Sequence, residues 1–349
     1  VCLNGHVDIK TSTGDKRIRI NRIHLEEDAG KLVHDDYAKV SLADYNRCGI
    51  PLIEIVTEPD FHSAEEVCAF IEKIRLLLKY AGVCDCKMEQ GSLRCDVNIS
   101  LAEKDSAELG TRAEIKNLNS VKAIGRAIEY EIYRQSEIIE SGGRVIQETR
   151  RFSDTTGETT AMRSKEDAHD YRYFPDPDIP PIIFTEEELD AIKASLPEMP
   201  EARKARYMSE YGMKEADADT IINDKEICDF FESAVSAYNN PKSILSFMLG
   251  EFMRRINLGE MSMETLKVKP EEVARLIEYG DTDKINKNNY KNIFKAMLET
   301  GKTPEEICDA ENYWVKEDSA LLESVIDKLI ADNPKPAEQY RSGEQKVFG

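Results

Sequence analysis

The sequence lacks any long apolar run, and no stretch approaches the roughly 20 residues that a membrane-spanning helix requires. It also lacks a basic segment followed by an apolar one at its start, so no secretory signal is visible. Aromatic residues make up only 7% of the 349 residues, whereas charged residues make up 33%. This composition is typical of a soluble, cytoplasmic protein with much helix, and the length predicts two or three domains.

The cysteines show no short-range framework of the kind that holds small secreted domains together. Cys84 and Cys86 stand closer together than the paired ligands of a structural zinc site usually do, and no second pair follows them at a suitable distance. The pattern therefore favours reduced thiols over disulfides or zinc.

The chain lacks the net positive charge that would attract a polyanion, because its formal charge is −20 at pH 7. The long-range field of such a protein repels phosphate, so any nucleic-acid role must depend on local patches. A glycine-rich phosphate loop of the Walker or dinucleotide type is also absent. That absence excludes the commonest nucleotide sites, although it does not exclude nucleotide use.

In the first half of the chain, short alternating runs bounded by Gly, Pro, Asn or Asp predict strands. These runs cover residues 17–20, 52–56, 92–100 and 113–115. Two helices are expected between them, one beginning at Ser63 and one over residues 120–140 that Gly142 and Gly143 end. Strands mixed irregularly with single helices favour an α+β fold with a mixed or antiparallel sheet over a doubly wound parallel sheet.

A cluster of prolines between residues 175 and 181 cannot lie inside a helix or a central strand, so it marks the exit from this domain. Thr185 then caps the first of a series of helices that Asn-Pro, Leu-Gly, Lys-Pro and Thr-Pro pairs separate. We expect an all-helical region with a seam near Lys267 to Pro270. The predicted domains are a catalytic domain over 1–188, a helical linking domain over 189–266 and a helical tail domain over 267–349.

The stretch from His24 to Lys31 crowds three carboxylates beside an imidazole. On a strand, His24 and Glu26 share one face and Glu27 lies on the other, but a bulge would change this pattern. Spacing alone therefore leaves open which glutamate faces a site. A solvated loop is the alternative.

Glu54 lies in the middle of the apolar run Leu-Ile-Glu-Ile-Val, and Glu114 has a similar place in another predicted strand. A buried carboxylate needs a partner, a proton or a metal, because leaving it unpaired outside water costs too much free energy. An exposed sheet edge is the alternative. Several glutamates on separate strands suit a hard cation such as Mg²⁺, whose shell nucleotide phosphates complete. The pattern points to phosphoryl chemistry, with Arg or Lys on the phosphate oxygens.

Other polar groups could bind phosphate or nucleic acid. Arg94, Asp96 and Asn98 alternate with apolar residues and form either a phosphate-binding face or simply the wet side of a strand. Arginines and aromatic residues gather over 147–151 and 162–174, either as a phosphate or base clamp or as a solvated hairpin. Four lysines are expected to line one helix face, as a patch for a nucleic-acid backbone or as solvated surface: Lys284, Lys287, Lys291 and Lys295.

Six motifs, in this order, resemble those of the B subunit of the aspartyl/glutamyl-tRNA amidotransferases. They are H-L-E-E-D-A-G-K (24–31), D-Y-N-R-C-G-I-P-L-I-E-I-V-T-E-P-D (44–60), M-E-Q-G-S-L-R-C-D-V-N-I-S (88–100), E-I-K-N-L-N-S (114–120), Q-E-T-R-R-F (147–152) and D-Y-R-Y-F-P-D-P-D-I-P (170–180). The resemblance implies a heterotrimer with the amidase, or A, subunit and the small C subunit, which acts on mischarged tRNA. It implies that ATP phosphorylates the side-chain carboxylate of Glu-tRNA(Gln) or Asp-tRNA(Asn). Ammonia from the amidase, made from glutamine, then displaces phosphate.

The resemblance also implies roles for single residues. Glu27, Glu54 and Glu114 would be the catalytic carboxylates and the ligands of Mg²⁺ near ATP. Glu89 is a secondary candidate for this nucleotide site. Arg94 and Lys116 are expected to contact phosphate, on the basis of their charge and position alone.

The sequence departs from this family at some points. It opens on Val1 and ends at Gly349, so we expect a piece without the family's N-terminal segment and without the end of the tail. Gln90 stands where a second glutamate is usual. We therefore expect no amidotransferase activity from this piece alone. Two rival functions are a non-catalytic tRNA-binding scaffold and a metal-dependent hydrolase, for which His24 is the only histidine within these motifs.

Overall fold

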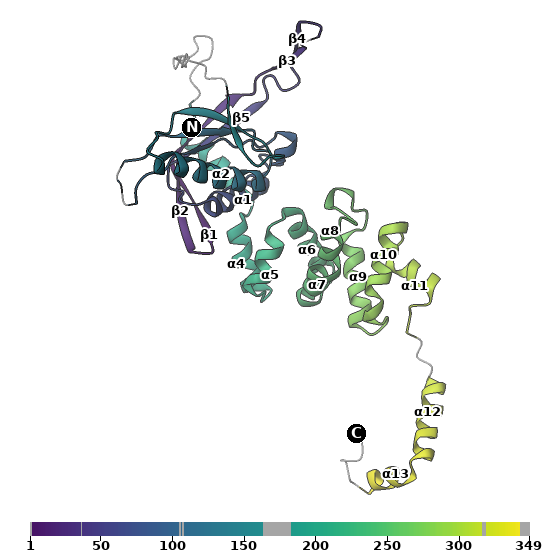
Figure 1. The fold of residues 1–349 in the computed structure, drawn as a ribbon. Coiled ribbons are helices and arrows are strands. Elements are labelled where there is room, and N and C mark those ends of the chain that lie inside the picture. The colour runs from purple at the N-terminus through teal and green to yellow at the C-terminus, as the bar shows by residue number, and fades with distance from the viewer. Residues whose placement is uncertain are drawn as a thin grey trace. The chain divides into compact units, whose positions relative to one another are not determined.

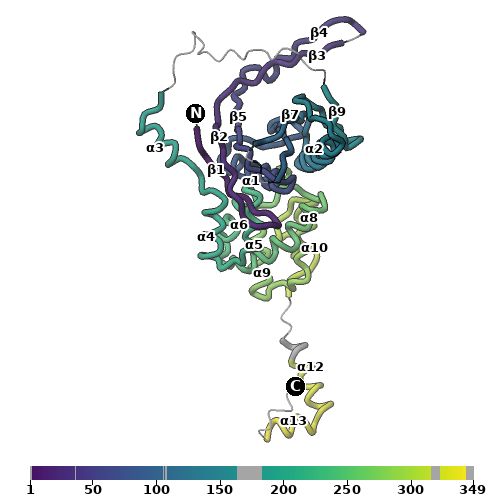
Figure 2. The backbone as a smooth tube through the Cα atoms, turned by 60° about the vertical axis from the view of Figure 1, so that its left-hand side comes forward, coloured from purple at the N-terminus to yellow at the C-terminus, as the bar shows by residue number. Residues whose placement is uncertain are grey.

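The computed structural model describes residues 2–35, 37–104, 106, 108–162, 183–315 and 319–342. The chain forms two compact units, residues 1–203 and 204–349 (Figures 1 and 2). The named strands of the described part all lie in the first unit, and helices build the second, so the predicted α+β fold followed by an all-helical region is confirmed. The arginine- and aromatic-rich segment beyond residue 162 and the proline cluster lie outside the described residues.

The first sheet of unit 1 is antiparallel, with the strand order β1-β2-β5. Its strands are β1 (Cys2–Thr11), β2 (Gly14–Glu27) and β5 (Pro51–Thr57). The strands predicted over 17–20 and 52–56 lie within β2 and β5. Between them, β3 (Lys31–Asp35) and β4 (Val40–Asp44) pair as a hairpin that projects from the sheet (Figure 2).

Helix α1 (Ala64–Tyr80) covers one face of this sheet and begins where the sequence predicts. Ser63 caps it by accepting a hydrogen bond from the Glu66 backbone N–H at 3.2 Å. Its apolar face packs Phe70 and Ile74 against Ile18 and neighbouring residues of β1 and β2. Burial of such side chains contributes about 1.5–3 kcal/mol each, so the helix and sheet form one stable layer pair.

The second sheet is mixed and has the order β6-β7-β8-β9, with β7 and β8 parallel and the other pairs antiparallel. Its strands are β6 (Val97–Ile99), β7 (Ala113–Lys116), β8 (Glu148–Phe152) and β9 (Thr159–Ala161). Helix α2 (Val121–Glu140) makes the crossover from β7 to β8, as parallel pairing requires. Helices α1 and α2 pack side by side between the two sheets.

The predicted strand over 92–100 is shorter in the structure, where only β6 is extended. The single-turn helix η1 (Met88–Gln90) ends at Gly91, whose φ of 76° turns the chain. The Ser92 hydroxyl then accepts a hydrogen bond from the Lys87 N–H at 2.8 Å, which holds residues 91–96 in a loop. The predicted alternation of exposed and partly buried side chains nevertheless persists from Ser92 to Ile99.

The helical part begins as predicted, because Thr185 forms a capping box with Glu188 at the start of α3. Pro241, Pro270 and Pro304 stand in the first turns of α7, α9 and α11, where the missing N–H of proline does no harm. The helices are α3 (Glu186–Ser195), α4 (Pro200–Glu210), α5 (Glu215–Ile222), α6 (Lys225–Ala237), α7 (Pro241–Phe247), the π-helical η2 (Met248–Phe252), α8 (Met253–Asn257), η3 (Met263–Thr265), α9 (Pro270–Asp281), η4 (Lys287–Asn289), α10 (Tyr290–Thr300), α11 (Pro304–Glu311), α12 (Ser319–Asp332) and α13 (Pro334–Arg341).

One apolar core, from Tyr207 to Cys308, holds the helices from α4 to α11 together. Rings pack edge to face within it, as between Phe247 and Phe294 with centroids 5.2 Å apart. This core continues across residue 267, where the sequence predicts a seam, and the three-part division of the chain stays a prediction. Among the described helices, none combines the length and the apolar content that a bilayer crossing demands.

The four lysines of unit 2 do not share one helix face, which corrects the sequence prediction. Lys284 lies in a turn, Lys287 in η4, and only Lys291 and Lys295 in α10. The helix is interrupted because Ile285 pairs with Trp314 in an isolated β-bridge and the Asn286 side chain caps η4. The lysines therefore follow a bent path rather than a straight stripe.

Candidate functional site

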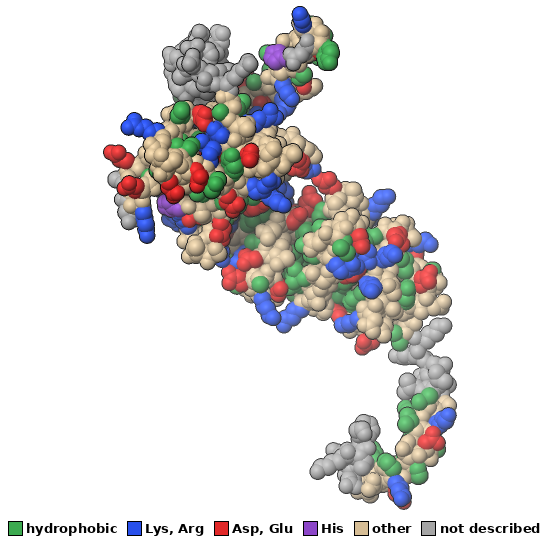
Figure 3. Space-filling model, viewed as in Figure 1, with side chains coloured by type: hydrophobic (Ala, Val, Ile, Leu, Met, Phe, Trp, Pro, Cys, Tyr) green, Lys and Arg blue, Asp and Glu red, His purple; other side chains and the backbone are tan. Residues whose placement is uncertain are grey.

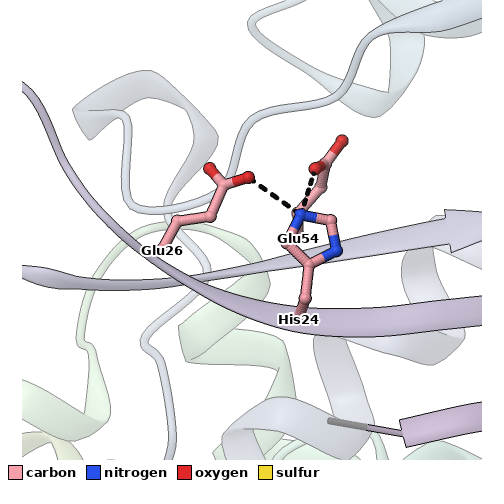
Figure 4. Close-up of side chains that lie close together, drawn as sticks. All are labelled: His24, Glu26 and Glu54. Carbon is pink, nitrogen blue, oxygen red and sulfur yellow. Dashed lines mark hydrogen bonds and ion pairs between the residues drawn. The ribbon is translucent and has the colours of Figure 1, made fainter. Parts of the chain in front are cut away.

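His24, Glu26 and Glu54 converge on the first sheet (Figure 4). His24 of β2 lies directly opposite Glu54 of β5 in the antiparallel register. The His24 Nε2 atom is 2.8 Å from Glu54 Oε2 and 2.9 Å from Glu26 Oε1. All three side chains remain partly accessible, so a ligand could reach them from solvent.

Strand alternation explains which glutamate joins this cluster. The register shift in the β2–β5 ladder lies between Ile20 and Arg22, before the acidic stretch, so alternation is regular from His24 onward. His24 and Glu26 therefore share a face, and Glu27, opposite Pro51, belongs to the other face. In the structure Glu26, and not Glu27, thus lies beside His24 and Glu54.

The cluster fits a divalent cation. An imidazole Nε2 carries at most one hydrogen, yet two carboxylate oxygens lie within 2.9 Å of it. One N–H group cannot donate a well-aligned hydrogen bond to both oxygens. Neighbouring ligands on an octahedral ion with bonds of roughly 2.0–2.1 Å lie about 3 Å apart, close to these separations. Among the described residues, this is the group of His, Cys, Asp and Glu close enough to hold a metal.

A second polar cluster lies on the mixed sheet. The Lys116 ammonium is 2.8 Å from Asp96 Oδ2 and 3.1 Å from Glu114 Oε1. Thr149 of β8 donates its hydroxyl to the other oxygen of Glu114 at 2.9 Å. Partial burial lowers the pKa of Lys116, but the hydrogen bonds to Asp96 and Glu114 outweigh this and raise it, so the ammonium stays charged.

A third cluster joins the end of β2 to the loop before β6. Asp28 accepts hydrogen bonds from the guanidinium groups of Arg47 and Arg94. The Arg94 hydrogen bond, together with that of Arg47, holds the pKa of Asp28 below its usual range despite the opposing effect of burial. The carboxylate is therefore ionised and links two cations.

A buried ionic network lies behind the mixed sheet. Glu131 of α2 is fully buried and pairs with Arg134 and Arg150, each at 2.9 Å. It also accepts a hydrogen bond from the Thr159 hydroxyl. Arg150 and Thr149 are neighbours on β8 and so lie on opposite faces of this strand. The network therefore holds β8 in place through Arg150, while Thr149 on the other face bonds to Glu114.

The structure places the predicted site residues in different groups. Glu54 belongs to the cluster with His24 and Glu26, whereas Glu114 lies on the mixed sheet beside Lys116. Glu27 is exposed on the opposite strand face, and Glu89 is exposed on η1. Their roles in catalysis, in metal binding and in phosphate binding stay predictions, as do those of Arg94 and Lys116.

Sequence reasoning placed His24 and Glu26 on one strand face and Asp96 on a possible phosphate-binding face, but it assigned none of them to the predicted metal site, and it did not consider Arg47. Period-two alternation could also have added Asp28 to His24 and Glu26, because the three lie at successive even positions. The sequence gave no such signal for Arg47, because its contact with Asp28 depends on how the loop that carries Arg47 folds.

The described lysines of unit 2 differ in their surroundings. Lys287 pairs with Asp281 at 2.6 Å, and Lys295 pairs with Glu299 at 3.6 Å. Lys291 has no ion pair with a described residue, and together with Lys287 it lines a cavity of about 300 Å³. Figure 3 shows Lys and Arg side chains gathered on this unit over helices α8 to α10. Lys284 likewise has no ion pair with a described residue, although its ammonium lies 5.5 Å from the centre of the Tyr279 ring, so Lys284 and Lys291 are the two members of the set that no carboxylate neutralises.

The first unit is therefore an α+β domain with one described cluster that could hold a metal ion, and the comparisons with known proteins give the family of the chain. Residues 1–190 match the family model described as the GatB/GatE catalytic domain, and residues 229–349 match the one described as the GatB domain. The chain belongs to the family of the B subunit of the aspartyl/glutamyl-tRNA(Asn/Gln) amidotransferases.

Curated relatives that bear this name are similar along the whole chain. The protein of Ruminiclostridium cellulolyticum is 50% identical over 349 residues, which cover 100% of this chain and 72% of the relative. The Caldicellulosiruptor saccharolyticus protein is 47% identical over 352 aligned residues, covering 100% and 73%. The Carboxydothermus hydrogenoformans protein is 45% identical, covering 99% and 73%.

Proposed function

We propose that this chain carries the kinase-like step of a tRNA-dependent amidotransferase. In this function, ATP phosphorylates the side-chain carboxylate of Glu-tRNA(Gln) or Asp-tRNA(Asn), and ammonia then replaces the phosphate. The observation that carries the proposal is the convergence of His24, Glu26 and Glu54 on one face of a sheet. Membership of the B-subunit family supports it.

The chemistry requires activation because a carboxylate is a poor electrophile. A carboxylate oxygen of the substrate attacks the γ-phosphorus of ATP, the bond to the β-phosphate oxygen breaks, and ADP leaves. The nitrogen of ammonia then attacks the carbonyl carbon of the acyl phosphate, and inorganic phosphate leaves as the amide forms. In such reactions the protein mainly positions groups and offsets charge.

The side chains of the two sheets suit these tasks. His24 Nε2 and the carboxylates of Glu26 and Glu54 would hold Mg²⁺, which offsets phosphate charge when bound. Lys116 keeps its positive charge beside Asp96 and is a candidate for a phosphate oxygen. Glu114, oriented by Thr149, is a further candidate carboxylate of this site.

The function further needs partners. The relatives are named as one lettered subunit, which indicates a complex, and we propose the amidase, or A, subunit and the small C subunit as the other members, in the cytoplasm. We propose mischarged tRNA as the substrate, with its backbone on unit 2 near Lys291. A non-catalytic tRNA-binding scaffold is the alternative.

The experiment that tests this proposal compares Glu54→Gln with the wild type in the full-length protein, assembled with both partner subunits. Phosphorylation is followed as ADP release dependent on Glu-tRNA(Gln) or Asp-tRNA(Asn), and tRNA affinity is measured in parallel. Loss of ADP release with tRNA affinity retained supports the enzymatic role. Unchanged ADP release in the variant would favour the scaffold. Glu58→Gln is the matched control, because Glu58 follows the same strand and bonds only to Asn21 among the described side chains.

A further inference from the structure

Backbone hydrogen bonds continue past the named strands β2 and β5 through a bulge in which Gly49 and Ile50 lie opposite Asp28, so the strand path of β2 extends to Asp28. The Asp28 backbone N–H donates to the Ile50 carbonyl at 2.9 Å, and its carbonyl accepts from the Gly49 N–H at 3.0 Å. Alternation therefore places Asp28 on the face of His24 and Glu26. Residues two apart on a strand are separated by about 7 Å, so Asp28 is the next position along this face.

Two arginines from different loops bind the Asp28 carboxylate through one oxygen. Arg47 donates to Oδ2 through Nε at 2.9 Å and through Nη2 at 2.5 Å, and Arg94 donates to it through Nη2 at 2.6 Å. The Asp28 side chain is only 14% exposed, whereas those of Arg47 and Arg94 are 48% and 52% exposed. The carboxylate thus acts as an internal anchor beneath two accessible guanidinium groups.

Both guanidinium groups keep donors for a ligand. A guanidinium has five N–H donors, and neither Arg47 Nη1 nor Arg94 Nη1 donates a hydrogen bond to a described residue. A Cβ placed on Gly91 would lie 3.5 Å from Arg47 Nη1, so the absence of a side chain there leaves space beside this nitrogen. With Asp28 counted, the group carries one net positive charge in a chain whose formal charge is −20.

We propose that Arg47 and Arg94, anchored by Asp28, form the site that binds the phosphate groups of the nucleoside triphosphate next to the His24–Glu26–Glu54 cluster. Neither Arg47 nor Asp28 has an assigned role. The proposal rests on the proposed function, because it takes ATP as the phosphoryl donor. Asp28 is a positioning residue here, since it acts through the two arginines.

The chemistry favours a nucleotide over an RNA backbone as the source of these phosphates. A guanidinium binds phosphate oxygens in a planar fork, and two of them fixed on one carboxylate lose little conformational entropy on binding. A polyphosphate also needs a cation along its length, and the cluster one position away on the same strand face can hold one. An isolated phosphodiester would use the arginines and leave that cluster without a role.

The experiment measures ATP binding directly as well as turnover, in the full-length protein with its partner subunits. Arg47→Gln and Arg94→Gln should each weaken ATP binding about 10- to 100-fold in calorimetry with ATP and Mg²⁺, because each removes charge-assisted hydrogen bonds. The KM for ATP should rise by the same factor, and the dissociation constant for tRNA should stay unchanged. Arg47→Lys, which keeps the charge but not the fork, should give a smaller rise.

Asp28→Asn tests the positioning role against a matched control. It should raise the KM for ATP about tenfold by releasing both arginines, with kcat changed less than KM. Asp60→Asn is the control, since Asp60 is 15% exposed and anchors Arg19 on the same sheet, and it should leave the KM for ATP unchanged. Thermal unfolding of each variant shows whether the fold is retained, and Arg47→Lys keeps the test valid if Asp28→Asn fails to fold.

The outcomes separate this inference from the proposed function. Unchanged ATP binding in Arg47→Gln and Arg94→Gln, in a complex whose wild type binds and uses ATP, would overturn the inference and leave the proposed function standing. Weaker tRNA binding with ATP binding retained would also overturn it, because the arginines would then bind RNA backbone. A wild-type complex with no ATP-dependent step would remove the proposed function itself, and the inference with it.

Discussion

His24 Nε2 lies 2.8 Å from Glu54 Oε2 across the paired strands β2 and β5, so two side chains 30 positions apart in the sequence meet at one candidate site. The contact depends on the register of the two strands. A slip of one residue would carry Glu54 to the other face of the sheet. The buried residues of the same sheet, Ile18 and Ile20 among them, fix this register by packing against α1. The apolar core of unit 1 therefore determines the geometry of the candidate site.

The first prediction distinguishes the two adjacent glutamates. Glu26→Gln should weaken binding of Mn²⁺, used as a spectroscopic probe for Mg²⁺, by at least about tenfold, because it replaces the charged carboxylate 2.9 Å from His24 Nε2 by a neutral amide. Glu27→Gln should change it little, because Glu27 lies on the other strand face. Electron paramagnetic resonance of the full-length protein titrated with Mn²⁺ measures both.

The reverse order of these two effects would contradict the strand alternation on which the assignment depends. His24→Ala serves as the positive reference, since it removes the nitrogen common to both contacts. Glu65→Gln is the neutral control, because Glu65 bonds to Ser12 at the other end of the sheet.

Local signals in the sequence predicted much of the fold. Ser63, Ser120 and Thr185 all cap helices where their positions indicated, because a side-chain cap and the hydrophobic period of a helix are both local. The strand predicted over 92–100 was too long, because polarity alternates there in a loop as well as in β6. Alternation reports which side chains face inward and does not by itself require a hydrogen-bonded partner strand.

The candidate site was harder to predict than the helices. Glu54 and Glu114 each stand out locally, yet they belong to different sheets and different clusters. Which carboxylates meet depends on strand pairing between distant segments, and spacing along the chain does not contain that information. The lysine series shows the same limit, since Ile285 leaves the helical path only because Trp314 pairs with it.

The second prediction concerns the buried glutamate behind the mixed sheet. Glu131→Gln should destabilise unit 1 by about 3–5 kcal/mol at neutral pH, because it removes the buried anion that Arg134 and Arg150 share and leaves them only the partly exposed Glu148. Far-UV circular dichroism in urea, with hydrogen exchange of α2 and β8, measures this effect. The single tryptophan, Trp314, reports on unit 2, so its fluorescence transition should not move. Glu137→Gln, an exposed position on the same helix, is the control and should have little effect.

The pH dependence of that effect follows from the direction of the pKa shift. Burial raises the pKa of Glu131, but hydrogen bonds from Arg134, Thr159 and Gln135 outweigh it, so the folded-state pKa lies below the ordinary 4.5. The stability contribution is therefore full above pH 4.5 and is lost as the pH falls through the folded-state pKa. The difference in the free energy of unfolding between wild type and Glu131→Gln should therefore become smaller over that pH range. A difference that stays constant down to the lowest pH at which the fold persists would show that charge is not its cause.

The third prediction concerns the hydroxyl that orients Glu114. Thr149→Val keeps the shape of the side chain but removes the donor 2.9 Å from Glu114 Oε2. If Glu114 acts in the phosphoryl step, the variant should lower kcat for tRNA-dependent ADP release by roughly 10- to 100-fold, as the loss of a supporting hydrogen bond at such sites does. Thr149→Ser restores the hydroxyl and should restore most of the rate. Equal rates for the two variants would mean that the hydroxyl has no functional role.

The fourth prediction compares two lysines of unit 2 as contacts for tRNA. Lys291 has no ion pair with a described residue, so Lys291→Gln should weaken tRNA binding and lower the slope of log K against log salt by about 1, as the loss of one phosphate contact does. Lys287→Gln should weaken binding less, because that ammonium already pairs with Asp281 at 2.6 Å. Filter binding of labelled tRNA between low and moderate salt measures both slopes. Lys302, exposed just beyond α10, supplies the control. A Lys302→Gln variant with the same loss as Lys291→Gln would mean that any exposed lysine serves and that Lys291 marks no particular contact.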